Sequence, residues 1–224
     1  MILSVGNTKG GVGKSTLAMS LCNYLSKQGR EVELFDLGQN SAVMGLYREE
    51  LADRKLLPYT VYSEQKEGQA LEMEFLLGVK KSPTIRVVDL PSVIHEKHQV
   101  ILKLSDIHLI PFEYSLLTIK STMQYLNYLN LIGGDTKNLL IRWKLDSRRH
   151  YKNQMATDLM LGEMSSFLMQ PVYDFSALQD ISVTGMSKEQ RKPVFRCFDE
   201  LLVYIDEIQK LQKEYSLEGE STLK

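Results

Sequence analysis

Residues 9–16 read Lys-Gly-Gly-Val-Gly-Lys-Ser-Thr and follow directly on the apolar run of residues 1–5. The apolar run predicts a buried strand, and the glycines leave room for backbone N–H groups to wrap a polyphosphate. Lys14 can reach the outer phosphates, the Ser15 hydroxyl can ligate magnesium, and the positive end of a following helix adds to the attraction. This pattern predicts a phosphate-binding loop between a strand and a helix, with nucleotide held by Lys9, Gly10, Gly11, Val12, Gly13, Lys14, Ser15 and Thr16.

Apolar runs alternate with helical patterns along the chain, as a parallel sheet with crossover helices requires. The strands are predicted at Ile2–Val5, Val32–Asp36, Ile85–Asp89, Ile107–Pro111, Leu139–Trp143 and near Val172. The helices are predicted at Lys14–Lys27, Val93–Leu104, Ser115–Ile132, Tyr151–Met169 and Lys188–Glu214. Residues 45–83 read as two helical pieces that are interrupted by Pro58 and a polar turn.

These elements predict an α/β fold, in which a doubly wound, mostly parallel sheet is flanked by helices. We expect a single domain over residues 1–214 and a frayed tail over residues 215–224. The chain is 43% hydrophobic and 25% charged, as in ordinary soluble globular proteins. It has no apolar run that could cross a bilayer and no signal-peptide pattern, so we expect a cytoplasmic protein.

The predicted strand that ends in Val87-Val88-Asp89 carries an acid at its carboxyl end. A rigid strand that ends beside a phosphate-binding loop can direct such a carboxylate at the magnesium shell. A strand-terminal aspartate can also serve as a helix cap or a surface residue. With the loop beside it, we interpret Asp89 as a magnesium-binding residue.

The loop also carries a second lysine, Lys9, at its front, and this octet resembles the deviant Walker A motif of the ParA/MinD family of P-loop ATPases. Leu90-Pro91-Ser92 after Asp89 is similar to the Asp-x-Pro-Pro stretch of ParA proteins, and residues 105–111 are similar to the strand that follows it. The resemblance covers most of the chain and is closest to small ParA-type plasmid partition proteins. It implies a P-loop NTPase fold and an ATP-bound homodimer, in which Lys9 reaches the nucleotide of the partner subunit and Lys14 binds its own.

In the ParA family the second strand leads into Asp-x-Asp-Pro-Gln, whose acids help to place magnesium and the attacking water. This chain keeps the first acid as Asp36 but has Gly38 in place of the second. Gln39 or Asn40 can orient a water without removing its proton; the segment can also be a simple turn. The resemblance implies ATP hydrolysis to ADP and phosphate that is weak and partner-stimulated, with catalytic roles for Lys9, Lys14, Asp36 and Gln39. The cofactors are ATP and Mg2+, and the metal ligands are Ser15, Asp36 and Asp89.

Basic residues gather between residues 137 and 152, where six of them stand against Asp146 as the one acid. A second basic cluster lies over residues 188–196. ParA proteins hold DNA non-specifically through basic residues in the later part of the chain, and such contacts are made to phosphates. A solvated charged surface explains the clusters equally well. The predicted DNA-binding residues are Arg142, Lys144, Arg148, Arg149 and Lys152.

The resemblance also places adenine contacts near Arg142-Trp143 and in the segment 175–181, although Trp143 can equally belong to the core. From Asp199 onward the chain has seven acids and three lysines, so we expect no attachment to anionic membranes. The resemblance as a whole implies an ATP-dependent dimerisation switch for DNA (plasmid) partition that binds non-specific DNA when ATP-bound. A centromere-binding or other partner protein would stimulate hydrolysis, and the protein would be nucleoid-associated. Alternatives are a MinD-like positioning ATPase for membrane or protein cargo, and a non-hydrolysing nucleotide-binding scaffold.

Overall fold

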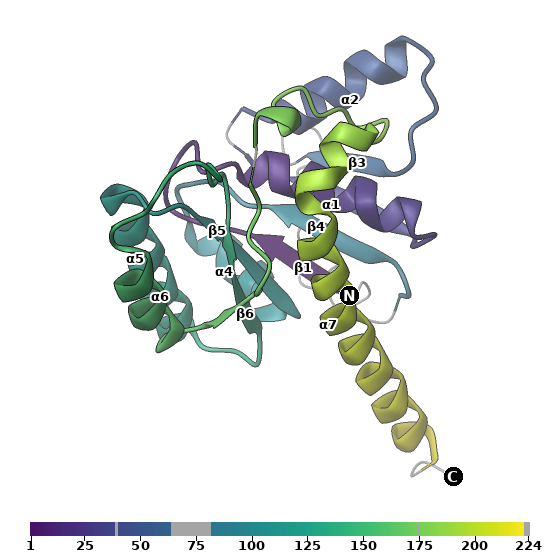
Figure 1. Ribbon diagram of the computed structural model, residues 1–224. Helices are drawn as coiled ribbons and strands as arrows, with labels where there is room; N and C mark the ends of the chain where they lie inside the picture. The colour runs from purple at the N-terminus through teal and green to yellow at the C-terminus, as the bar shows by residue number, and fades with distance from the viewer. Residues whose placement is uncertain (39, 64–81, 174, 222–224) are drawn as a thin grey trace.

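The computed structural model describes residues 1–38, 40–63, 82–173 and 175–221. Its strands are β1 (Ile2–Val5), β2 (Val32–Asp36), β3 (Thr60–Ser63), β4 (Ile85–Asp89), β5 (Ile107–Phe112), β6 (Lys137–Arg142) and β7 (Ser166–Phe167). They form one seven-stranded sheet in the order β3-β2-β4-β1-β5-β6-β7, and every neighbouring pair is parallel (Figure 1). The predicted doubly wound α/β fold is confirmed.

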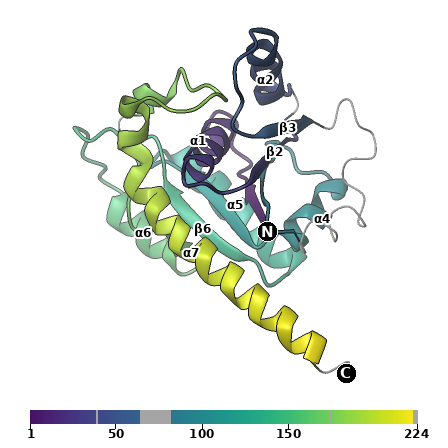
Figure 2. The ribbon, with the colours of Figure 1, turned by 90° about the vertical axis from the view of Figure 1, so that its right-hand side faces the viewer.

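The described helices are α1 (Lys14–Lys27), α2 (Ala42–Ala52), α4 (Glu96–Leu104), α5 (Leu116–Ile132), α6 (Gln154–Gly162), the 3-10 turn η1 (Phe175–Leu178) and α7 (Lys188–Ser221). Both faces of the sheet are covered (Figure 2). Apolar side chains of α1, α2 and α7 form one core with the sheet, and those of α4, α5 and α6 form the other. Two buried faces explain why the central strands read as continuous apolar runs.

Alternate residues of one strand enter different cores, because successive side chains of a strand point to opposite faces. In β1, Leu3 and Val5 pack against α1, whereas Ile2 packs on the side of α4 and α5. Ser4 and His108 lie opposite each other in β1 and β5, and their side chains form a buried hydrogen bond. The central strand therefore anchors both layers and holds the start of the phosphate-binding loop rigidly.

The carboxyl ends of β1, β2 and β4 meet at one edge of the sheet. Val5 is in register with Asp89, and Asp89 is in register with Asp36. In open parallel sheets, ligands bind outside the carboxyl ends of the strands, where the crossovers diverge to opposite sides. This edge is therefore the place where the fold can build a site.

Two predictions of secondary structure are wrong. Residues 60–63 form the edge strand β3, where we expected helix; their burial alternates as on a pleated edge, and α2 ends at Ala52, before Pro58. The sixth predicted strand lies earlier, at Ser166–Phe167, and α6 ends at Gly162. Near the predicted position, the Val172 N–H donates to the carbonyl of Arg142, the last residue of β6, and the Val172 carbonyl accepts from the Leu145 N–H. The remainder of the second predicted helical piece lies in residues 64–81, outside the described residues.

The last helix, α7, runs from Lys188 to Ser221 and extends beyond the body of the domain (Figures 1 and 2). It continues past residue 214, into the segment where we expected fraying. Acids of α7 bind the body: Asp199 accepts a hydrogen bond from Tyr24, and Asp206 accepts one from Arg30 at 2.6 Å. Some acids of this region are thus engaged in hydrogen bonds between α7 and the rest of the domain. None of the described helices has the length and apolar character to span a membrane.

Candidate nucleotide-binding site

The loop between β1 and α1 adopts the backbone shape that its glycines permit. Gly11 and Gly13 have φ angles of 75° and 96°, in the left-handed region that favours glycine. A Cβ atom on Gly13 would lie 2.6 Å from the Trp143 ring nitrogen. Gly13 is the N-cap of α1 and, as a glycine, offers no side-chain acceptor to the first N–H groups of the helix. The first N–H groups of α1 therefore remain available to an anion.

The two lysines of the loop differ in where they lie. Lys14 is buried, and its Nζ donates to Ser92 Oγ at 2.7 Å and to the Lys9 carbonyl at 3.4 Å. Burial lowers the pKa of Lys14, while the nearby Asp89 carboxylate opposes that shift. Lys9 Nζ donates to the carbonyl of the exposed Gly10 at 3.0 Å. Of these two lysines, only Lys14 lines the cleft at the carboxyl edge of the sheet.

Two carboxylates stand beside Lys14 at the ends of β2 and β4. Asp36 is held by backbone N–H groups of Gly38 and Met44, each at 3.0 Å. Both carboxylate oxygens of Asp89 are buried and accept no hydrogen bond from the described residues. Burial raises the pKa of Asp89 to about 7; the Ser15 hydroxyl opposes this rise and Asp36 adds to it. A buried carboxylate with so little hydrogen bonding is unfavourable in itself, so this acid fits a cation such as magnesium.

A cleft of about 490 Å³ opens above these groups. Its lining includes loop glycines and Lys14, the two acids Asp36 and Asp89, and residues 38 and 40–42. Lys144 and Gln179 line the cleft as well, so the segment 175–181 does reach it through Gln179. Trp143 is fully buried beneath Gly13, which supports the core interpretation of this residue.

The basic residues predicted to bind DNA are divided among three environments. Lys144 belongs to the cleft: its Nζ donates to the Gly11 carbonyl at 2.6 Å. Burial lowers the pKa of Lys144, with the Glu113 carboxylate opposing. Its backbone has a φ of 60°, an unfavourable conformation for a residue with a Cβ. This turn redirects the side chain toward the phosphate-binding loop.

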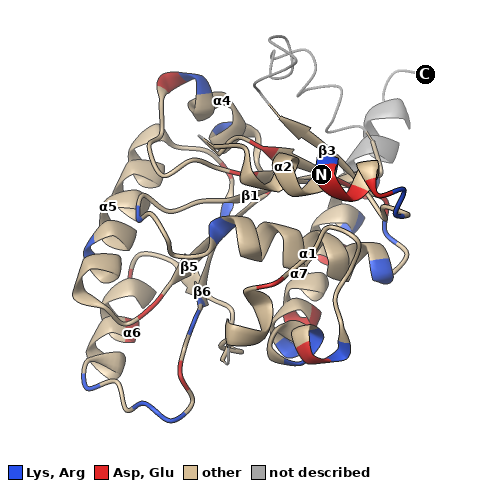
Figure 3. Cartoon of the chain, turned by 90° about the horizontal axis from the view of Figure 1, so that it is seen from above, with Lys and Arg blue, Asp and Glu red and all other residues tan. Residues whose placement is uncertain are grey.

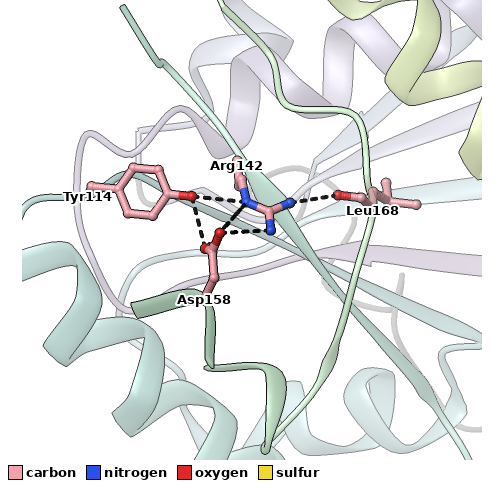
Figure 4. A network of polar contacts seen from close by, with 4 residues as sticks. All are labelled: Tyr114, Arg142, Asp158 and Leu168. Carbon is pink, nitrogen blue, oxygen red and sulfur yellow. Dashed lines mark hydrogen bonds and ion pairs between the residues drawn. The ribbon is translucent and has the colours of Figure 1, made fainter. Parts of the chain in front are cut away.

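Arg142 belongs to an internal network (Figure 4). Its guanidinium donates to the Asp158 carboxylate at 3.0 Å, to Tyr114 Oη at 3.0 Å and to the Leu168 carbonyl at 3.3 Å. It also lies over the Phe167 ring, 4.3 Å from the centroid. The side chain is 13% exposed. The donors of Arg142 are thus engaged by Asp158, Tyr114 and the Leu168 carbonyl. Arg142 is therefore not proposed as a DNA contact.

Arg148, Arg149 and Lys152 lie on the exposed loop that leads into α6 (Figure 3). Arg148 is 89% exposed and pairs with Asp146 at 3.1 Å. The Arg149 guanidinium lies 5.2 Å from the centre of the Tyr151 ring. These three residues stay candidates for a phosphate-binding surface. Gln39, the predicted water-orienting residue, lies outside the described residues.

No role was predicted for Ser92 or Gly6, yet both support the site. A Cβ atom on Gly6 would lie 2.0 Å from the Tyr125 hydroxyl, so glycine is required where β1 enters the loop. Ser92 stood inside the stretch similar to Asp-x-Pro-Pro, and its hydroxyl in place of a proline was the available signal. Gln179 lies in the segment 175–181, where the resemblance placed adenine contacts, although nothing in the sequence distinguished it from its neighbours.

A family model for the CobQ/CobB/MinD/ParA nucleotide-binding domain matches residues 3–212. The chain therefore belongs to this family of nucleotide-binding domains. No curated protein sequence gives a significant match. Solved structures match the fold over most of its length.

Among them is a plasmid partition protein from Borrelia burgdorferi, 19% identical, with a TM-score of 0.63 over 90% of this chain and 97% of that one. The ATP complex of a single-residue variant of McdA from Cyanothece is 16% identical, with a TM-score of 0.60 over 88% and 93%. Cobyrinic acid a,c-diamide synthase from Mycobacterium smegmatis, with bound ADP and magnesium, is 17% identical, with a TM-score of 0.59 over 82% and 91%. At these identities the matches show a common fold.

Proposed function

We propose that this protein is a ParA-like, ATP-dependent dimerisation switch that binds non-specific DNA in its ATP-bound state and acts in DNA partition. The observation that carries the proposal is the division between the two loop lysines. Lys14 lines the cleft, whereas Lys9 is not among the lining residues and donates to the carbonyl of the exposed Gly10. A lysine at the front of the loop that does not line the cleft of its own subunit is available to the nucleotide of a second subunit.

The cleft supports ATP with magnesium as the ligand. Lys14 and the free N–H groups at the start of α1 offer positive charge to the phosphates. Ser15 and Asp89 are suited to hold magnesium, because hydroxyl and carboxylate oxygens are its preferred ligands. Asp36, held by two backbone donors, is positioned to orient the magnesium shell. Magnesium would neutralise phosphate charge and compensate the buried Asp89 carboxylate.

DNA contact is proposed for the loop before α6. Arg148, Arg149 and Lys152 are exposed there, within a stretch where the one acid, Asp146, is paired. Contacts of this kind neutralise phosphates and weaken steeply with salt. Dimerisation would place two such loops on one particle, which increases their joint affinity for a single duplex. Hydrolysis would end the dimeric state and so release the DNA.

The oligomeric state tests the proposal. Light scattering is expected to find a dimer with magnesium and a non-hydrolysable ATP analogue, and a monomer with ADP or no nucleotide. The Lys9→Ala variant should bind the analogue yet remain monomeric. Lys55→Ala, which removes an exposed lysine after α2, is the matched control and should dimerise normally. A nucleotide-independent mass, or a normal dimer of Lys9→Ala, would contradict the proposal.

A non-hydrolysing scaffold is the second candidate, and Gly38 is the observation that favours it. The family pattern has an acid there, and a Cβ atom at Gly38 would lie 3.0 Å from Asp36 Oδ1. The segment that begins at Asp36 thus carries one carboxylate, where the family pattern has two. Phosphate release distinguishes the candidates: turnover above that of Lys14→Ala supports the switch, and turnover equal to it supports the scaffold.

A further inference from the structure

Ser92 has an unusual position for a hydroxyl group in this cleft. It lies between β4 and α4, in a segment without regular secondary structure, and it is half-buried. Its Oγ accepts a hydrogen bond from Lys14 Nζ at 2.7 Å. No residue in the described part of the chain accepts the proton of the Ser92 hydroxyl in turn. The Ser92 hydroxyl therefore accepts a hydrogen bond, while its own proton remains available for donation.

The Ser92 hydroxyl stands at the front of the phosphate-binding loop. A Cβ atom on Gly10 would lie 3.9 Å from Ser92 Oγ. The lysine of such a loop contacts the outermost phosphates of a bound nucleotide. A hydroxyl that touches the ammonium group of this lysine therefore stands beside the position of the terminal phosphate.

Nucleotide binding competes with the present contact between Lys14 and Ser92. In the structure, neutral acceptors hold the Lys14 ammonium: the Ser92 hydroxyl and the Lys9 carbonyl. Phosphate oxygens carry negative charge and accept a stronger hydrogen bond than either. When Lys14 moves to the phosphates, the Ser92 hydroxyl loses its donor and needs a new partner.

We propose that Ser92 distinguishes a nucleoside triphosphate from a diphosphate, an inference that rests on the proposed ATP-binding function. With a triphosphate bound, the Ser92 hydroxyl donates to an oxygen of the terminal phosphate and so regains a hydrogen bond. With a diphosphate, that oxygen is absent and the hydroxyl returns to water. Ser92 acts as a specificity-determining residue, and the loop that carries it leads directly into α4.

The Ser92→Ala variant separates these two states. It removes a hydrogen bond to a charged group from the triphosphate complex alone, so the ratio Kd(ADP)/Kd(ATP analogue) should fall roughly tenfold. It also removes a competing acceptor for Lys14 from the free protein, which raises the affinity for both nucleotides equally and leaves the ratio unchanged. Ser92→Thr keeps the hydroxyl and is expected to keep most of the wild-type ratio.

Isothermal titration calorimetry with AMPPNP and with ADP, both with magnesium, measures this ratio for the wild type and the two variants. Thermal melting of each variant without nucleotide verifies that it is folded. The expected result is a wild-type preference for AMPPNP that Ser92→Ala loses and Ser92→Thr retains. A preference that is unchanged in Ser92→Ala, or is absent from the wild type, would overturn the inference but leave nucleotide binding intact. A wild type that binds neither nucleotide would contradict the proposed function as well.

Discussion

Gly13 and Trp143 are in direct apposition: a Cβ atom on the glycine would lie 2.6 Å from the indole nitrogen. Trp143 is fully buried at the end of β6, so it cannot retreat from an added side chain without disturbing the core. The phosphate-binding loop follows β1, whose neighbour in the sheet is β5. The loop thus packs against a residue that follows β6, one strand further away. The shape of the loop depends on packing as well as on its own glycines.

Gly13→Ala is expected to weaken nucleotide binding at least about a hundredfold. The added methyl group collides with Trp143, and the φ of 96° is unfavourable for alanine. Both effects displace the loop and the first N–H groups of α1. Trp143 is the one tryptophan of the chain and lies against the loop. Its fluorescence can therefore be used to follow nucleotide binding in titrations.

Gly29→Ala is the matched control for that variant. Gly29 has a φ of 76°, and a Cβ atom there would contact nothing within 4 Å among the described residues. The variant should lose about 1 kcal/mol of stability through backbone strain, and its nucleotide affinity should equal that of the wild type. Equal affinities of Gly13→Ala and Gly29→Ala would refute the packing argument.

Asp158→Ala should destabilise the fold by about 3 kcal/mol, because it leaves the Arg142 guanidinium largely buried without its carboxylate partner. Arg148→Ala removes an exposed pair with Asp146 and should change stability by less than about 0.5 kcal/mol. Urea denaturation of both variants without nucleotide provides the comparison. Similar losses in the two would show that Arg142 is no more structural than Arg148.

His108 should make the fold sensitive to acid. Burial lowers the pKa of His108 to about 4, and the backbone of Leu102 opposes this shift. Between the unfolded pKa and this lower value, the unfolded chain binds the extra proton, so stability falls as the pH falls. From pH 7 to pH 5 the wild type should lose about 2 kcal/mol more than His108→Gln. Equal losses in urea titrations of the two proteins would show that His108 does not cause the sensitivity.

The nucleotide edge of the sheet could be predicted because its signals are local. The octet of the loop lies in one short stretch, and Asp36 and Asp89 each end an apolar strand. Parallel strands bring their carboxyl ends together, so order along the chain was enough to place these acids near the loop. The magnesium ligands follow from that geometry and stay predictions.

Other parts of the site depend on contacts between distant segments. Charge counting grouped Arg142 with Arg148, but the partner of Arg142 is Asp158 on the following helix. Lys144 enters the cleft because its backbone turns to a φ of 60°, which composition does not reveal. The edge strand β3 was missed because four residues are too short for a clear period. Such features follow from tertiary packing, which overrides local preference.

ATP is expected to create a DNA-binding state of the protein, and retention on non-specific duplex DNA measures that state directly. The wild type and the double variant Arg148→Ala/Arg149→Ala are compared with ATP, ADP or no nucleotide, at low and moderate salt. We predict retention of the wild type with ATP alone, weaker at moderate salt, and loss of retention in the double variant. Retention that is equal in all nucleotide states, or that is absent from all of them, would contradict the account.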